Sequence, residues 1–237
     1  MTYQTALKIP QTQTNQNDRL DWLRLIRSRR VGPATFYRLM NEHGSAAAAL
    51  DALPRIAQDA GVKDYCTFSH KAAYDELTCG AAMGLKLLLF SDPEYPQLLR
   101  TIHDPPPTLW TQGNLELLSK PAIAMVGARN ASSLGTRMTR QLAKELGAAG
   151  FVVVSGLARG IDAAAHTATL KSGTIAVQAG GIDVHYPKEN STLHDEIAQQ
   201  GGLLSPGGRW TVVDPAALCA RCQPGFGGYP AAGGDKQ

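Results

Sequence analysis

The sequence predicts an α/β protein built on a doubly wound parallel sheet, preceded by a small all-helical domain. Residues 122–205 contain three short apolar runs, each followed by a glycine-rich turn and then by a helical pattern. Each run is also continuous, as expected of strands that are buried on both faces of a parallel sheet. Repeated strand-loop-helix units of this kind favour a doubly wound sheet.

The helical domain is predicted for residues 19–80, after a lead-in over residues 1–18 that is rich in Gln, Thr and Asn. Apolar residues recur at helical spacing in three short stretches, which Gly-Pro and Gly-Ser turns separate. The predicted helices cover residues 20–26, 36–41 and 46–53, and the third ends at Pro54. Short helices joined in this way are typical of sterile-alpha-motif-like or helix-hairpin-helix domains.

Arginines are concentrated on or beside the first helix: Arg19, Arg24, Arg27, Arg29 and Arg30. The backbone amides of the Gly32-Pro33 turn, flanked by these side chains, could hold one phosphate. An arginine-rich helix face is also commonly just a solvated surface. The sequence leaves both interpretations open.

The sheet domain is predicted for residues 81–205 and begins with a strand-helix-strand unit. A strand is expected over residues 87–90, and a proline-containing turn from Asp92 leads into a short helix. A second strand follows the Asp-Pro-Pro-Pro turn at Asp104, and Gly113 closes the segment.

The three later units are predicted with strands at residues 123–126, 151–154 and 174–177 and helices at 136–146, 163–170 and 192–199. Carboxyl ends of neighbouring parallel strands meet at one edge of the sheet, where open α/β folds bind ligands. All three loops at that edge are rich in Gly, Ser and Ala, so a ligand can approach the backbone closely. The helix N-termini that follow offer unpaired N–H groups to an anion.

A phosphate fits these loops best, because Arg129 lies in the first loop and Arg159 in the second. Each guanidinium can contact a phosphate through two hydrogen bonds. Any single glycine-rich loop can also reflect nothing more than a tight turn. The predicted phosphate-binding residues are Gly127, Arg129, Ser132, Ser155, Gly156, Arg159, Gly160, Gly180, Gly181 and Lys188.

No catalytic residue is predicted. Ser132 and Ser155 are potential nucleophiles, but no spacing brings a base and an orienting acid to either of them. Asp162 and His166 lie four residues apart on one helical face, so we expect a local Asp-His pair that supports the loop geometry.

No metal site and no cofactor is predicted either. Cys66 and Cys79 lack metal-ligand spacing and are interpreted as ordinary small residues. Cys219 and Cys222 form a lone Cys-x-x-Cys pair, whereas zinc needs two further ligands.

Composition and charge restrict the class of protein. The formal net charge is only +3, so any nucleic-acid site must be a local patch. No apolar run approaches the roughly 20 residues that span a bilayer, and the first 18 residues lack the features of a signal peptide. Four cysteines without framework spacing fit a reducing compartment. We therefore expect a cytoplasmic protein without membrane contact.

Several strings between Leu20 and Ser205 resemble the core of the DprA (Smf) family. They are Val-Gly-Ala-Arg-Asn-Ala-Ser from Val126, Ser-Gly-Leu-Ala-Arg-Gly-Ile-Asp from Ser155, Ala165-His166, Gly-Gly-Ile-Asp from Gly180, and Tyr186-Pro187. The second string is long and unusual, which makes the resemblance specific. Asp92-x-x-Tyr-Pro followed by Asp-Pro-Pro also resembles the family, in which this stretch extends the sheet.

The resemblance implies an extended Rossmann-like domain and a role in bacterial natural transformation and recombination. Proteins of this family bind single-stranded DNA, protect incoming DNA and help to load the RecA recombinase. It also implies a homodimer. The predicted phosphate-binding residues would then hold the DNA backbone largely without regard to base sequence.

The chain departs from the family pattern after Ser205. The family continues with an acidic residue, a Pro-Gly loop and a Phe-Pro-x-Arg-Asn-Arg motif, whereas this chain reads Pro-Gly-Gly-Arg-Trp from Pro206. Residues 206–237 hold 7 Gly and 4 Pro, which predicts a disordered, aberrant tail. We hypothesise that a frame change or truncation removed the later strands and left an unpaired sheet edge with exposed apolar helix faces.

Two alternatives remain open at this point. The first is a nucleotide-binding Rossmann enzyme such as a nucleoside-monophosphate phosphoribohydrolase. Enzymes of that kind typically contain a Pro-Gly-Gly-x-Gly-Thr string, and Pro206-Gly207-Gly208 resembles only the start of it. The second is a nonfunctional truncated remnant.

Overall fold

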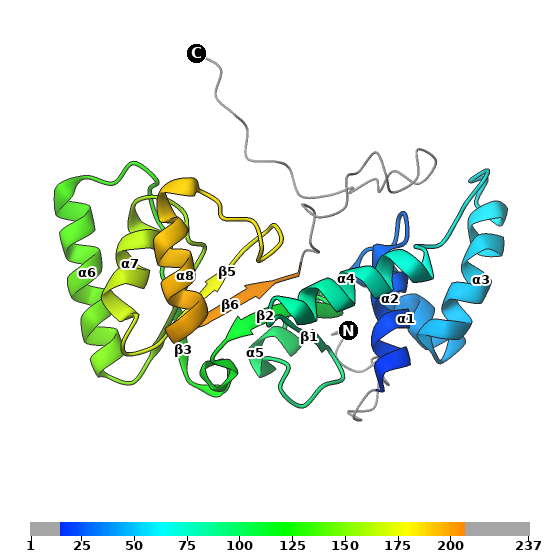
Figure 1. Cartoon of the computed structure of the whole chain (residues 1–237), viewed down its shortest axis with the longest axis horizontal. Helices are drawn as coiled ribbons and strands as arrows, with labels where there is room; N and C mark the ends of the chain where they lie inside the picture. Colours follow the sequence, from blue (N-terminus) through cyan, green and yellow to red (C-terminus); the bar gives the residue numbers. More distant parts are fainter. Residues whose placement is uncertain (1–14, 207–237) are drawn as a thin grey trace, which may run out of the picture.

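The fold is known from a computed structural model, which describes residues 15–206 (Figure 1). A helical domain precedes a six-stranded mixed sheet with the strand order β1-β2-β6-β5-β4-β3. The predicted α/β class, with a helical domain before a mostly parallel sheet, is thereby confirmed. The predicted domain boundaries remain predictions, and the tail expected from residue 207 onward, with Cys219 and Cys222, lies outside the described residues.

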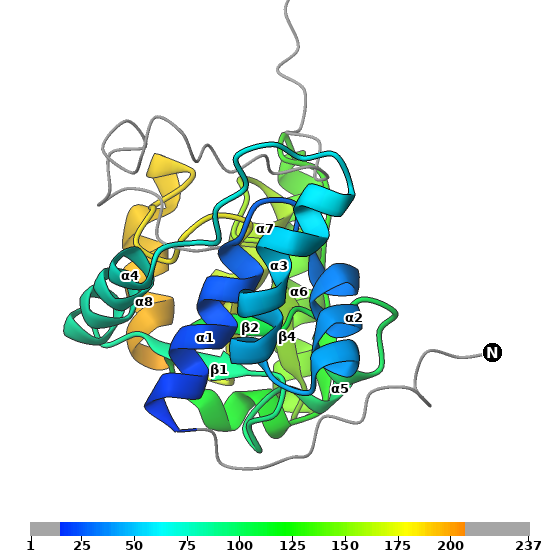
Figure 2. The same ribbon diagram turned by 90° about the vertical axis from the view of Figure 1, so that its right-hand side faces the viewer.

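The helical domain consists of α1 (Gln16–Arg27), α2 (Pro33–His43), α3 (Ala46–Asp59) and α4 (His70–Ala82). In Figure 2, α1, α2 and α3 lie side by side. A capping box fixes the start of α1, because the Asn15 side chain accepts a hydrogen bond from the Asp18 amide while the Asp18 carboxylate accepts one from the Asn15 amide. Helix α1 therefore begins inside the segment expected to be a lead-in.

Helix α3 corrects one prediction, because it does not end at Pro54 but continues to Asp59. Proline removes one backbone hydrogen bond from a helix interior. The turn beyond it is held by packing instead, since Ala57 is buried and Ile56 packs against the main core. Tertiary contact outweighs the local preference at this position.

One hydrophobic core joins the helices to the sheet. Five aromatic rings follow one another from α1 and α2 to the residues just beyond β1, with successive centroids 5.0–5.5 Å apart: Trp22, Phe36, Tyr37, Phe90 and Tyr95. Edge-to-face contacts of this kind add to the free energy gained by burial. The helical domain is thus fixed firmly against the first strands of the sheet.

The parallel part of the sheet contains β3 (Ala122–Ala124), β4 (Val152–Ser155), β5 (Thr174–Val177) and β6 (Gly202–Ser205). The antiparallel strands β2 (Thr108–Gly113) and β1 (Lys86–Leu89) extend it beyond β6. This extension is the one that the family resemblance implied. Strand β6 was not predicted, although it lies at the centre of the sheet and joins the two parts.

Helices α6 (Ser133–Ala148), α7 (Ile161–Thr169) and α8 (Ser191–Gln200) stand side by side on one face of the sheet (Figure 1). The 3-10 helix η2 (Leu115–Ser119) packs Leu117 against the other face. The short elements α5 (Gln97–Arg100) and η3 (Lys188–Asn190) lie in connections. Among the described residues, no helix has the length and apolar character that crossing a membrane requires.

Strand β3 was expected to be buried on both faces, and that expectation is wrong. Within residues 15–206 it pairs with β4 alone, so it forms an edge of the sheet. Val126 is 78% exposed, and Met138 on the neighbouring helix α6 is 64% exposed. A shallow apolar groove runs between them, lined by Ala124, Met125, Val126, Gly135, Met138, Thr139, Gln141, Leu142, Glu145 and Ile161. The hypothesis of missing strands stays a prediction, because the tail lies outside the described residues.

Candidate functional site

The loops that follow β3, β4 and β5 meet at the carboxyl edge of the parallel strands. Ser155, the last residue of β4, joins the first two loops, because its hydroxyl donates a 2.6 Å hydrogen bond to the Met125 carbonyl. This side chain is buried. The hydroxyl proton is therefore engaged inside the protein, and the structure supports neither phosphate contact nor nucleophilic attack by Ser155.

Gly160 and Gly127 allow the first and second loops to touch. Gly160 has a φ of +80°, and a Cβ atom there would overlap the carbonyl oxygens of Ala128 and Arg129. At Gly127 a Cβ atom would overlap the side chain of Ile161. These two glycines are thus required for loop packing, which is a role distinct from direct contact with an anion.

Asp162 occupies backbone amides that the sequence suggested for a phosphate. Its buried carboxylate lies 3.2 Å from the amide nitrogen of Gly156 and 3.4 Å from that of Ala158, and it accepts a hydrogen bond from each. An internal carboxylate thus substitutes for an anionic ligand at the start of α7. These two hydrogen bonds are compatible with the predicted supporting role of Asp162, which stays a prediction.

His166 is fully buried and bonds to β5 instead of to Asp162. Its Nδ1 lies 2.7 Å from the Thr174 hydroxyl, which itself donates to the Val153 carbonyl at 2.9 Å. Because the hydroxyl proton is used, Nδ1 carries the proton of the neutral ring. Burial lowers the pKa of His166 to about 4, against the opposing charge of Asp162. The predicted Asp-His pair is replaced by a His-Thr bond that ties α7 to the sheet.

Asn190 stabilises the second loop, and the sequence analysis did not single it out. Its side-chain amide donates hydrogen bonds of 2.9 and 3.2 Å to the carbonyls of Leu157 and Ala158. Leu157 has a φ of +59°, an unfavourable conformation for a leucine, and its side chain is buried. The buried Leu157 side chain and the two hydrogen bonds from Asn190 of η3 together stabilise this strained turn.

The cations at this edge are exposed. Among residues 15–206, Arg129 has no ion-pair partner, and Arg159 makes only a long 3.7 Å contact with Glu189 while both side chains remain more than half exposed. Lys188 is exposed at the start of η3. These three side chains can turn toward an anion at little cost, because exposed ion pairs contribute little to stability.

Ser132 and the third loop complete the predicted set. The Ser132 hydroxyl caps α6 by accepting a 3.1 Å hydrogen bond from the Gly135 amide, which leaves its own proton for a ligand. Gly180 is exposed, with open space where a side chain would point, and its carbonyl accepts a hydrogen bond from the Ser205 hydroxyl. Gly181 is buried, so Gly180 is the residue of this pair that a ligand can reach.

Arginines of the helical domain are mostly engaged within the protein. Arg19 contacts both carboxylate oxygens of Asp92, at 2.7 and 2.9 Å. The guanidinium of Arg27 forms a buried 3.0 Å ion pair with Glu76, whose carboxylate also accepts a hydrogen bond from the Trp110 indole. These two side chains hold the domain on the sheet and are unavailable to a phosphate.

Family models match two parts of the chain. The model described as a DprA-like N-terminal HHH domain matches residues 16–79, and the model described as DNA recombination-mediator protein A matches residues 86–222, which is more than half of the chain. The second match extends beyond Ser205, the last residue of the stretch whose motifs resemble the family.

Curated relatives have the same family name. The DNA processing protein DprA of Bacillus subtilis is 42% identical over 137 residues, which are 56% of this chain and 44% of that protein. The Streptococcus pneumoniae protein is 45% identical over 113 residues, or 47% and 40% of the two chains. The chain thus spans less than half the length of the curated relatives that it matches.

Solved structures agree with the family models. The X-ray structure of DprA from Streptococcus pneumoniae matches with a TM-score of 0.56 at 31% identity, covering 73% of this chain and 55% of that one. A structure of the Helicobacter pylori protein, described as giving insight into its single-stranded DNA binding mode, matches with a TM-score of 0.50 at 31% identity, covering 58% and 62%. The chain described here therefore belongs to the DNA recombination-mediator protein A (DprA) family.

Proposed function

We propose that this protein binds single-stranded DNA through the loops at the carboxyl edge of its parallel strands. One observation carries the proposal: Arg129 and Arg159 are exposed on two loops that Gly160 and Ser155 hold in contact. Two guanidinium groups carried on loops in contact suit the phosphates of a flexible strand. The related Helicobacter pylori protein, whose structure concerns single-stranded DNA binding, supports the same ligand.

The proposed contacts are fewer than the sequence predicted. Arg129, Arg159 and Lys188 supply charge, and the Ser132 hydroxyl and the exposed backbone around Gly180 supply polar contacts. Gly127, Ser155, Gly156 and Gly160 act by shaping the loops. Contacts to phosphate carry no base information, so the proposed binding is independent of DNA sequence.

We also propose, from family membership, that this binding serves DNA processing in natural transformation in the cytoplasm. Protection of incoming DNA, loading of the RecA recombinase and homodimer formation belong to the same proposal. They concern the whole protein, and this chain spans less than half of the curated relatives. The proposed activity involves no covalent chemistry.

A binding measurement tests the proposal directly. Fluorescence anisotropy of a labelled oligo-dT strand would be compared between the protein and an Arg129→Ala, Arg159→Ala variant. We expect salt-sensitive binding, and we expect the variant to bind more weakly and with less dependence on salt. A matched control is Lys120→Ala, Lys171→Ala, which removes the same charge from the opposite, amino edge of the strands, where both lysines are exposed.

The outcome separates the remaining alternatives. A phosphoribohydrolase would release free base from a nucleoside monophosphate, which a chromatographic assay of the same preparation detects. A folded protein that neither binds the strand nor releases base would contradict the proposal and favour a nonfunctional remnant. Equal losses of DNA affinity in the two double variants would show that the net charge of the protein governs binding, and not the arginines at the carboxyl edge of the strands.

A further inference from the structure

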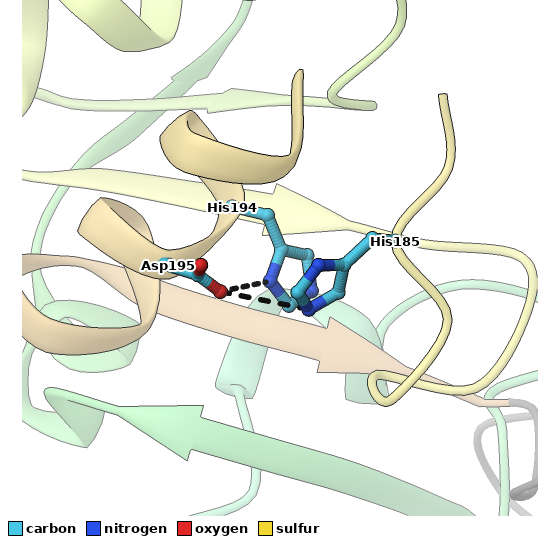
Figure 3. A group of neighbouring side chains, drawn as sticks. All are labelled: His185, His194 and Asp195. Atoms are coloured by element: carbon cyan, nitrogen blue, oxygen red, sulfur yellow. Dashed lines mark ion pairs between the residues drawn. The ribbon is translucent and has the colours of Figure 1, made fainter. Parts of the chain in front are cut away.

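A second cluster of polar side chains joins the third loop to α8. His185 comes from that loop, and His194 and Asp195 are consecutive residues of α8 (Figure 3). The Asp195 carboxylate oxygen Oδ1 is 3.5 Å from His185 Nε2 and 3.5 Å from His194 Nδ1. The two imidazole rings face each other with centroids 4.2 Å apart.

His194 is the most informative member of the cluster. Its side chain is only 4% exposed, yet neither ring nitrogen has a partner within normal hydrogen-bond geometry. Buried polar atoms nearly always have a hydrogen-bond or metal partner, so a buried imidazole without one indicates that His194 binds a ligand. In Figure 3 the His194 ring lies beside both His185 and Asp195.

The spacing of each imidazole from Asp195 suits two ligands of a tetrahedral metal site. Zinc binds imidazole nitrogen and carboxylate oxygen at about 2.0–2.2 Å, so two ligand atoms at a tetrahedral angle lie about 3.4 Å apart. Both measured distances to Asp195 Oδ1 are 3.5 Å, and all three ligand atoms lie within 4.8 Å of one another. A 3.5 Å separation is too long for a hydrogen bond of normal strength, but it is suitable for two ligands of one ion.

We propose that His185, His194 and Asp195 bind a zinc ion, with water as the fourth ligand. Two imidazoles and one carboxylate suit zinc among the available divalent ions, whereas magnesium and calcium prefer oxygen ligands alone. The Ile182 carbonyl lies near the His194 ring, outside normal hydrogen-bond geometry, and offers the backbone partner that a zinc-bound imidazole usually has. The ion would connect the third loop to α8 and so order the segment that carries Gly180.

Zinc titration of the full-length chain tests the proposal without any assay of DNA binding. The protein, free of any polyhistidine tag, would compete with a chromogenic zinc chelator. We expect one equivalent of zinc to bind and to raise the melting temperature, because the ion binds the folded state preferentially. Cobalt in place of zinc should give the intense visible absorption of a tetrahedral site with nitrogen and oxygen ligands.

Variants assign the ion to these residues. His185→Ala alters an exposed side chain and should weaken zinc binding at least about 10-fold, since even indirect partners of a metal have effects of that size. His70→Ala, which removes an exposed histidine at the start of α4, should have no effect. Cys219→Ser, Cys222→Ser removes the Cys-x-x-Cys pair and should also leave the affinity unchanged.

Each contrary result overturns the proposal. Absence of zinc binding would do so, as would equal affinity of His185→Ala and the unaltered chain. Binding that disappears in Cys219→Ser, Cys222→Ser would assign the ion to the cysteines. Since the readouts are affinity, melting temperature and absorption, the result does not depend on whether the protein binds DNA.

Discussion

The Ile161 backbone amide donates a 3.2 Å hydrogen bond to the Ala128 carbonyl, and this bond joins the loop after β3 to the start of α7. The first two loops of the proposed site therefore form one unit. The nearby glycine at 160 makes the contact possible, because any side chain there would overlap the same carbonyl. Loop geometry, more than the number of cations, should determine whether the site functions.

Replacing Gly160 with alanine is expected to disrupt the joined loops. The residue has a positive φ, and the added Cβ atom would overlap two carbonyl oxygens, so we predict a loss of about 1–3 kcal/mol in the free energy of unfolding together with weaker DNA binding. Urea denaturation and anisotropy measure the two effects. Gly150→Ala is the matched control, because that residue also has a positive φ but has open space around it and precedes β4, away from the proposed site. Equal behaviour of the two variants would contradict the prediction.

Buried His166 should make stability fall in acid. Its pKa is lowered from 6.5 to about 4, so the folded state binds fewer protons than the unfolded state between these values. The contribution of the neutral ring is fully present above pH 6.5 and is lost as the pH falls toward about 4. At 1.36 kcal/mol per pKa unit, the loss by pH 4.5 is about 2–3 kcal/mol.

Urea denaturation from pH 7 to pH 4.5 checks this, with His166→Asn as the reference. The asparagine amide can donate to Thr174 as Nδ1 does but does not titrate. The stability difference between the two proteins should therefore narrow in acid by the amount given above. A constant difference across the range would refute the assignment.

Removing one partner of the buried ion pair Arg27–Glu76 should destabilise the protein strongly. Both side chains are less than 10% exposed, so Glu76→Leu leaves a buried guanidinium unpaired and should cost about 3–5 kcal/mol. Arg27→Met combined with Glu76→Leu should recover much of that loss. Glu42→Ala, which removes an exposed ion pair with Arg38, should change stability by no more than about 1 kcal/mol. Similar costs for the two single variants would argue against a structural role for the buried pair.

The exposed apolar groove beside β3 should promote self-association. Met138 and Leu142 are more than half exposed, and replacing both with glutamine keeps helix propensity while removing apolar surface. Sedimentation velocity should show less oligomer for this variant than for the unaltered protein. Leu98→Gln, at an exposed residue of α5, is the control. Unchanged sedimentation of the groove variant would contradict this role.

Much of the fold could be predicted from the sequence because its local signals agree with the final packing. The strand over residues 174–177 was predicted at its observed bounds, since a short apolar run between two turns is typical of a buried strand. Pro54 and β3 show where such signals fail. A proline can be held inside a helix by contacts that form later, and an apolar run does not reveal whether it will lie at the centre or the edge of a sheet.

The candidate site was predicted in outline but not in its division of roles. Sequence identified the loops and their arginines, whereas the bonds of Asp162 to backbone amides and of Ser155 to a backbone carbonyl depend on how the loops fold back. The role of Asn190 could not be predicted from local sequence, because the two carbonyls that it contacts lie more than 30 residues away in the chain. Its position shortly after Tyr186-Pro187 was the one signal available. The cluster of His194 with its two neighbours depends likewise on how the third loop returns to α8.

The salt dependence of DNA binding tests the central claim most directly. Each contact to a single-strand phosphate contributes about 0.7 to the slope of log affinity against log salt concentration. The Arg129→Ala, Arg159→Ala variant should therefore show a slope shallower by about 1.4, while Lys120→Ala, Lys171→Ala keeps the original slope. Identical slopes for all three proteins, each folded, would show that these two arginines do not contact phosphate and would contradict the proposed site.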